Sequence, residues 1–173
     1  DIMKGDAYHC PQKPFGGDED YIWSSDSKSI IYVSKKLSGT KAAQSTNTDI
    51  YQYNIITGKT TNLTADNKGY DTHPLYSVNG DLAYLSMKTD GFEADKNDIK
   101  VISTGITTNL TARWDESVNS FIWAADGKSL YFIAAVYGTL QVFNVDFPGM
   151  TKKLPLVTQL TKGDWDANNI IGL

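Results

Sequence analysis

The sequence is poor in the residues that build metal centres and disulfides. It has one cysteine, Cys10, among 173 residues, so it can form neither an internal disulfide nor a thiolate metal cluster. The pair His9-Cys10 would need about two further ligands to close a zinc site, and no second pair lies nearby in the sequence. We therefore expect no metal site, and nothing in the sequence indicates a cofactor.

The features of nucleic-acid-binding and membrane-spanning proteins are also absent from the sequence. The net charge is −4 and no run of Lys or Arg is longer than two, which argues against nucleic acid as a partner. No stretch approaches the roughly 20 apolar residues that cross a bilayer, so we expect no membrane span.

Residues for nucleophilic catalysis are missing as well. No G-x-S-x-G nucleophile elbow occurs anywhere in the chain. The only histidines are His9, in an expected connector, and His73, at the start of an expected strand. No glycine-rich turn indicates an oxyanion hole. We predict no catalytic residue in this chain.

What the sequence does contain is aromatic residues in a repeated strand–turn–strand pattern. Ten Tyr, six Phe and four Trp with only five Pro favour a β-rich globular protein. In the clearest copy, Asp126-Gly127 lies between two apolar runs and predicts a hairpin with a type I′ turn. Ser27 and Asn79-Gly80 take the corresponding places in two further copies. The three copies cover residues 21–32, 73–84 and 121–132.

Two independent markers keep nearly the same period along the chain. The aromatic residue before each turn is Trp23, Tyr76 and Trp123, at spacings of 53 and 47. A Leu-Thr pair ends each unit, with its leucine at Leu63, Leu110 and Leu160, at spacings of 47 and 50. Each unit resolves into four short strands, and no segment has a convincing helical period.

Four antiparallel strands in each of several units of about 40–50 residues are typical of β-propeller blades. A β-sandwich of regular hairpins is the alternative, but sandwiches do not repeat motifs at a fixed period. We predict an all-β fold, a partial β-propeller of about three four-stranded antiparallel blades.

The predicted organisation is a single partial propeller domain over residues 1–173. Its parts are the end of a preceding blade and a connector, three blades, and the start of a further blade, at residues 1–20, 21–64, 70–111, 114–161 and 162–173. Propellers close with about four to eight blades, so three blades cannot close a ring and we expect a fragment. The open strand edges of such an arc predict self-association.

The order of these motifs resembles a known group of proteins. Leu-Thr, then an aromatic residue with Asp, then a Trp-Ser-x-Asp-Gly-Lys-like hairpin is similar to the propeller repeats of the prolyl oligopeptidase family and of TolB-type propellers. Residues 85–99 and 114–118 look like the propeller of the bacterial dipeptidyl and acylaminoacyl peptidases of that family.

The resemblance implies a non-catalytic propeller within a serine exopeptidase. Such a propeller would gate the access of peptide substrates to a C-terminal α/β-hydrolase domain of the parent chain. A periplasmic or secreted location is implied by the resemblance alone. The alternative is a free-standing TolB-like propeller that binds a protein partner and catalyses nothing.

The loops between the second and third strands of the units are the longest, at residues 35–48 and 88–97, and long loops on a rigid scaffold are where binding usually resides. We expect Glu93, Asp95 and Glu116 on that face, as substrate-binding carboxylates that attract the ammonium group of a peptide. The alternative is a solvated loop of mixed charge, because Lys88 and Lys96 partly neutralise it.

An aspartate follows an aromatic residue in each connector, at Asp71, Asp115 and Asp166. Because the aspartates recur at equivalent places, we interpret them as structural residues whose side chains accept backbone N–H groups, together with the aromatic markers. The alternative is an acidic ring.

Overall fold

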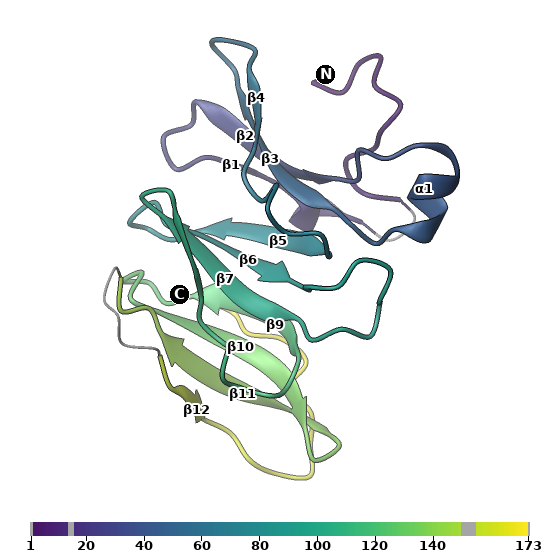
Figure 1. Cartoon of the computed structure of the whole chain (residues 1–173). Coiled ribbons are helices and arrows are strands. Elements are labelled where there is room, and N and C mark those ends of the chain that lie inside the picture. Colours follow the sequence, from purple (N-terminus) through teal and green to yellow (C-terminus); the bar gives the residue numbers. More distant parts are fainter. Residues whose placement is uncertain (1, 14–15, 150–154, 173) are drawn as a thin grey trace. The chain divides into compact units, whose positions relative to one another are not determined.

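The structure is all-β and consists of three four-stranded sheets of antiparallel strands in chain order (Figure 1). It is a computed structural model that describes residues 2–13, 16–149 and 155–172. The predicted fold class is confirmed in its three sets of four strands.

The first sheet contains β1 (Tyr21–Trp23), β2 (Ser29–Ser34), β3 (Asp49–Asn54) and β4 (Thr60–Asn62). A short 3₁₀ helix, η1 (Asp18–Asp20), precedes it. The second sheet contains β5 (Asp71–Tyr76), β6 (Leu82–Ser86), β7 (Asp98–Ser103) and β8 (Ile106–Asn109). The third contains β9 (Val118–Trp123), β10 (Ser129–Val136), β11 (Thr139–Asp146) and β12 (Val157–Gln159).

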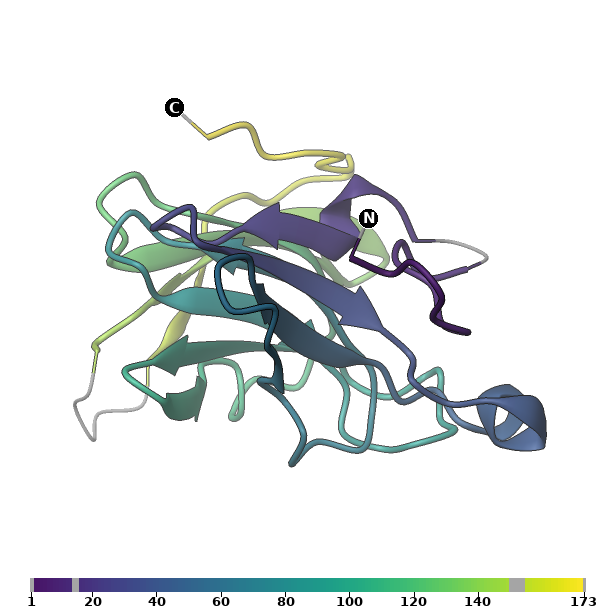
Figure 2. The ribbon, with the colours of Figure 1, turned by 90° about the horizontal axis from the view of Figure 1, so that it is seen from above.

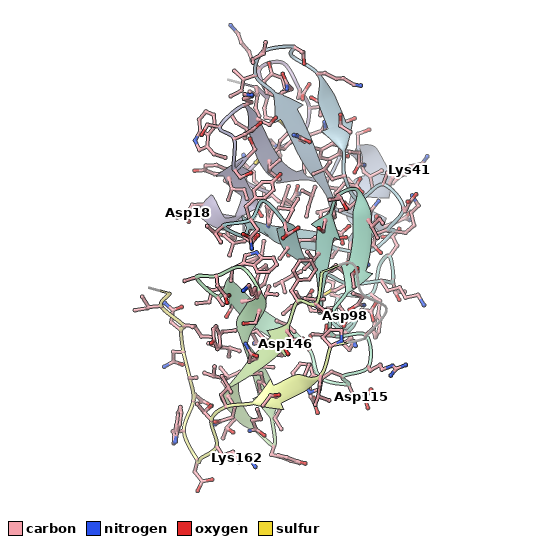
Figure 3. The ribbon with its side chains drawn as sticks, turned by 90° about the vertical axis from the view of Figure 1, so that its left-hand side faces the viewer. Asp18, Lys41, Asp98, Asp115, Asp146 and Lys162 are labelled. Carbon is pink, nitrogen blue, oxygen red and sulfur yellow. The ribbon has the colours of Figure 1, made fainter. Side chains whose placement is uncertain are left out.

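One α-helix was not expected from the sequence. The helix α1 (Gly39–Gln44) lies in the loop between β2 and β3, and Figure 2 shows it at the far end of that loop. Its six residues bury no side chain, which is why no apolar period marks them. Lys41 points outward from it (Figure 3).

The Asp126-Gly127 turn differs from the predicted type I′ turn. Gly127 has a φ of 67°, but Asp126 is not among the described residues with positive φ. Trp123 pairs with Leu130, and the Ala124 N–H donates to the Ser129 carbonyl at 2.9 Å, so four residues form the loop. A loop of this length is built on a type I turn, whereas type I′ suits two-residue loops.

Two-residue turns with positive φ at both positions occur elsewhere. They are Thr104-Gly105, between β7 and β8, and Tyr137-Gly138, between β10 and β11. The φ values are 48° and 81° for the first turn and 53° and 80° for the second. These pairs have the type I′ signature that the sequence pattern assigned to Asp126-Gly127.

The Leu-Thr marker has the same structural role in all three sheets. The leucine N–H donates to the carbonyl of one residue of the third strand, and the threonine hydroxyl accepts the N–H of that same residue. These hydroxyl bonds join Thr64 to the Ile50 N–H, Thr111 to the Ile99 N–H and Thr161 to the Val142 N–H, at 3.0, 3.0 and 2.9 Å. The threonine therefore extends the pairing where the fourth strand departs.

The chain divides into two compact parts, Asp1–Pro74 with Ser86–Asp95, and Leu75–Leu85 with Lys96–Leu173. In the second part, residues of β6, β7, β9, β10 and β11 form one apolar core. The Trp114 ring packs onto it, with centroids 5.2 Å from Phe132 and 5.1 Å from Phe143. Trp114 is partly buried against this core, and its ring contacts fix the connector between β8 and β9 against the third sheet.

Candidate functional site

Two long loops of the first compact part meet at Asp90. One is the β2–β3 loop, which carries α1, and the other follows β6. Asp90 Oδ1 accepts the Ser45 hydroxyl at 2.6 Å and the Thr46 N–H at 2.9 Å, and the Gly91 N–H donates to Thr46 Oγ1 at 3.0 Å. The Ser45 hydroxyl, and after it the backbone N–H of Thr46, hold the pKa of Asp90 below its usual value. Asp90 therefore joins the two loops as a carboxylate.

Lys35 stabilises the β2–β3 loop by hydrogen bonds to backbone carbonyls of the same loop. Its Nζ donates to the carbonyls of Ala42 and Ser45, at 3.1 and 2.6 Å, and its N–H donates to Gln12 Oε1 at 2.9 Å. The ammonium group is thus engaged by backbone carbonyls at the end of α1, where a cation is favourable.

These loops, together with residues of the N-terminal segment, line an open cavity of about 430 Å³ in the first compact part. Most of its lining residues are uncharged; Lys13, Lys35 and Glu93 are the charged ones and Tyr70 is the aromatic one. Glu93 is exposed and has no hydrogen bond or ion pair among the residues that the structure describes. A carboxylate in this position is open to a ligand.

Tyr70 has carboxylates around it. Burial raises the pKa of its hydroxyl, and Asp20, Glu19 and Glu93 add to the shift in that order. Asp20 is itself buried, which raises the pKa of its carboxyl group, although its Oδ2 accepts the Gln12 N–H at 2.7 Å. The three carboxylates make the surroundings of Tyr70 favourable to a cation.

Of the three predicted substrate-binding residues, one lines the cavity and two are not among its lining residues. Glu93 lines the cavity. Asp95 shapes its own loop, because its Oδ2 accepts the N–H groups of Lys88 and Thr89 at 3.0 and 2.7 Å. Glu116 is exposed in the second compact part and is not among the residues that line this cavity.

Lys96, which was expected to neutralise these carboxylates, is engaged elsewhere. Its Nζ lies 2.8 Å from Asp98 Oδ1 and donates to the carbonyls of Thr111 and Trp114. Within the second compact part, Lys96 therefore ties the connector after β8 to the start of β7.

The three connector aspartates have different surroundings. Asp71 is fully buried, and its Oδ1 accepts the Ser86 hydroxyl at 2.5 Å and the Asn67 amide at 2.9 Å. Asp166 Oδ1 accepts the Leu140 N–H at 2.7 Å. Asp115, labelled in Figure 3, is exposed. The aromatic markers differ too, since Trp123 is buried and Trp23 is exposed.

Sequence reasoning missed Asp90, Lys35 and Tyr70. Asp90-Gly91 is a recognisable turn signal, but the partners of Asp90 lie about 45 residues away, and no local pattern predicts them. Within residues 2–13, 16–149 and 155–172, no group of three or more His, Cys, Asp or Glu is placed to hold a metal ion. In the same ranges, no helix has the length and apolarity to cross a membrane.

The comparison with solved structures identifies the fold. The β-propeller domain of the Trilobed protease from Pyrococcus furiosus matches 84% of this chain and 40% of its own, with a TM-score of 0.55 and 14% identity. The acylaminoacyl peptidase of Pyrococcus horikoshii matches 86% of this chain and 22% of its own, with a TM-score of 0.56 and 16% identity. TolB from Acinetobacter baumannii matches 83% of this chain and 32% of its own, with a TM-score of 0.51 and 20% identity. The chain consists of β-propeller blades.

Sequence comparison finds relatives among the dipeptidyl-peptidase 5 proteins. The chain is 37% identical over 169 residues to dipeptidyl-peptidase 5 of Porphyromonas gingivalis, which covers 96% of this chain and 24% of that protein. Dipeptidyl-peptidase 5 of Trichophyton equinum is 29% identical, over 86% of this chain and 22% of that protein. The sequence matches no protein-family model.

These relatives place the chain with the propeller region of dipeptidyl-peptidase 5 proteins, in the prolyl oligopeptidase family. The resemblance inferred from the repeat motifs is confirmed. The chain spans about a quarter of the length of these relatives.

Proposed function

We propose that this chain is the non-catalytic propeller of a serine exopeptidase of the dipeptidyl or acylaminoacyl peptidase type, and that it gates peptide access to an α/β-hydrolase domain of the longer protein. The identity of 37% across 96% of the chain to a dipeptidyl-peptidase 5 carries this proposal. The absence of a G-x-S-x-G elbow from these 173 residues agrees with a role outside the chemistry. A periplasmic or secreted location belongs to the same proposal.

In this proposal the cavity of the first compact part receives the amino terminus of the peptide. Glu93 supplies the carboxylate that pairs with the ammonium group, and Glu19 and Asp20 strengthen the negative potential around Tyr70. Lys13 is the opposing charge at the wall, while Lys35 is occupied by carbonyls. Asp95 acts by shaping the loop that carries Glu93, and Glu116 adds a further negative charge.

The test is a kinetic comparison in the full-length protein with a chromogenic dipeptide and its N-acetylated form. Removing a charge-assisted hydrogen bond costs about 1.5–3 kcal/mol, so Glu93→Gln should raise KM for the free amine about tenfold or more. We expect kcat and the acetylated substrate to be little affected. Asp146→Asn, an exposed carboxylate at the end of β11, is the matched control. Equal KM values for Glu93→Gln and the unaltered protein would remove the cavity from the proposal.

The gating role is tested separately from the cavity. A G-x-S-x-G elbow followed by Asp and His, downstream of Leu173 in the same coding sequence, is expected. A coding sequence that ends once the propeller is complete would instead favour a free-standing, partner-binding propeller, for which the TolB fold likeness is the supporting observation.

A further inference from the structure

The start of the third strand can be aligned between the three sheets by one backbone hydrogen bond. In each sheet a carbonyl at this point accepts an N–H of the chain that follows the fourth strand, and these carbonyls belong to Thr48, Asn97 and Leu140. The residues on either side of each carbonyl point to the same face, because side chains alternate along a strand. The flanking pairs are Asn47 with Asp49, Lys96 with Asp98, and Thr139 with Gln141.

In the second sheet the flanking pair contains a cation. The Lys96 ammonium lies 2.8 Å from Asp98 Oδ1 and donates to the carbonyls of Thr111 and Trp114, at 3.1 and 2.7 Å. Asp98 also accepts the Thr111 hydroxyl and the Asn109 amide, each at 2.8 Å. A carboxylate and two carbonyls thus surround one positive charge.

In the third sheet an uncharged donor has the same role. Gln141 stands where the other sheets have aspartate, and its Nε2 donates to Thr139 Oγ1 and to the carbonyls of Gly163 and Trp165, at 3.2, 3.2 and 2.8 Å. The Thr161 hydroxyl donates to Gln141 Oε1 at 2.8 Å. In both sheets, therefore, a donor joins the third strand to carbonyls of the chain that follows the fourth strand.

The first sheet has the carboxylate without a cation bound to it. Asp49 Oδ2 accepts the Tyr51 hydroxyl at 3.1 Å. Burial, and after it the charge of Asp49, raise the pKa of Tyr51, so this partner stays neutral. Asp49 Oδ1 and Asn47 Oδ1 are buried and accept no hydrogen bond from the residues that the structure describes. A buried carboxylate oxygen without a partner is unfavourable, so Asp49 requires a donor or a cation that these residues do not supply.

The backbone of the first sheet matches that of the second at this point. The Asn67 N–H donates to the Thr64 carbonyl at 2.9 Å, as the Trp114 N–H donates to the Thr111 carbonyl at 3.0 Å. The carbonyls of Thr64 and Asn67 are therefore equivalent to the two that accept the Lys96 ammonium.

The lysines near Asp49 in the sheet and its loops are engaged elsewhere. Lys36 is two residues beyond the cross-strand partner of Asp49 and donates to the Tyr32 hydroxyl at 3.1 Å. Lys35 and Lys68 donate to backbone carbonyls of their own loops. Among the described residues none of the three forms an ion pair with Asp49. The charge of Asp49 is thus not balanced by direct contact with a lysine.

We propose that the first sheet binds a calcium ion at Asp49, in the place that the Lys96 ammonium has in the second sheet. The protein ligands are Asp49 Oδ1, Asn47 Oδ1 and the carbonyls of Thr64 and Asn67, and water completes the shell. Calcium takes about 6–8 oxygen ligands of these kinds. The expectation of no metal site was based on thiolate and imidazole ligands, which calcium does not use. This inference does not depend on the proposed function.

Calorimetric titration with calcium chloride tests the site in the full-length protein that contains this chain, in sodium chloride at physiological ionic strength. A site with one carboxylate is expected to bind with a Kd of about 0.1–1 mM. Asp49→Asn keeps the size of the side chain and should lose this binding. Asp98→Asn is the matched control and should keep it, because Asp98 is paired with Lys96. Equal calcium binding by Asp49→Asn and the unaltered protein would overturn the proposal, because water or sodium would then satisfy Asp49.

Two substitutions of Asn47 separate a metal from an internal hydrogen bond. Asn47→Lys introduces the ammonium of the second sheet and should abolish calcium binding while the far-UV circular dichroism is unchanged. Asn47→Asp adds a second carboxylate and should tighten binding about tenfold, since affinity rises with the charge of the ligands. Calcium binding that persists in Asn47→Lys, or that weakens in Asn47→Asp, would overturn the proposal.

Discussion

Ser27 has a left-handed backbone conformation that its side chain disfavours. Its φ is 57°, whereas the same place in the other two hairpins is taken by Gly80 and Gly127, with φ of 87° and 67°. The Ser27 N–H donates to the Ser24 carbonyl at 2.9 Å, and this bond closes the turn despite the strain. The left-handed conformation destabilises the folded state by roughly 1–2 kcal/mol for a residue with a Cβ. A glycine avoids this strain, but its greater backbone entropy in the unfolded state offsets about 0.5–1 kcal/mol of the gain.

We expect Ser27→Gly to raise the free energy of unfolding by about 0.5–1 kcal/mol, because the relief of strain exceeds the entropic term. Urea denaturation measures this change. Ser27→Ala keeps the Cβ and should show no gain. Gly127→Ser should destabilise, since the φ of 67° at this position is strained for a residue with a Cβ. A Ser27→Gly protein no more stable than Ser27→Ala would refute the strain argument.

At the scale of elements, the strands were predictable because their signals are local. Alternation in Asp49–Asn54 and the turn residues around it place β3 without reference to the rest of the chain. The exceptions depend on distant contacts. β5 begins at Asp71, two residues earlier than the pattern indicates, where the Asp71 N–H bonds to the Thr48 carbonyl. The helix α1 was missed because it has no apolar face and Lys35 holds its end.

The candidate site was predictable only in part for the same reason. The length of the loop after β6 pointed to Glu93, which lines the cavity. The residue that fixes the rim, Asp90, acts on Ser45 and Thr46 of another loop, and sequence distance hides such a pairing. Hydrogen bonds between loops follow from the fold, so they become visible only after the strands are placed.

Asp90→Ala should loosen both loops together. Loss of its carboxylate frees the Thr46 N–H and the Ser45 hydroxyl, so we expect faster amide exchange at Thr46 and at Gly91, measured by NMR. Asp95→Ala is the matched control within the same loop, because it should speed exchange at Lys88 and Thr89 and leave Thr46 unaffected. Exchange at Thr46 unaffected by Asp90→Ala would contradict the role of Asp90.

The pH dependence of this contact follows from the lowered pKa of Asp90. A carboxyl group whose folded-state pKa is depressed stabilises the fold above its unfolded-state pKa of about 3.9 and loses that contribution as the pH falls through the folded-state value. The Thr46 and Gly91 resonances should therefore stay constant from neutral pH down to about pH 4 and change below it. A change centred near pH 6 would point to a different group.

At the scale of the whole molecule, two kinds of surface are open to association. The outer edges β4 and β12 are only three residues long, and short edge strands are poor templates for pairing. The second is a set of large apolar side chains of the first sheet, Tyr21, Trp23 and Ile55, which are 47%, 59% and 44% exposed. We call this set the Trp23 face, and its burial is the larger driving force. We predict that the chain studied alone self-associates, with the open edges and the Trp23 face as the two competing routes.

Sedimentation velocity over a range of concentrations separates these routes. Trp23→Lys places a charge on the Trp23 face and should shift the chain towards monomer. The Leu63 N–H donates inward to the Ile50 carbonyl, and because N–H groups alternate in direction along a strand, the Thr60 N–H points outward at the free edge of β4. Thr60→Pro therefore removes a donor from that edge without breaking a bond within the sheet. We expect it to have the smaller effect, given three-residue edges. Association lost with Thr60→Pro and kept with Trp23→Lys would assign the contact to the edges, and a monomer at all concentrations would refute self-association altogether.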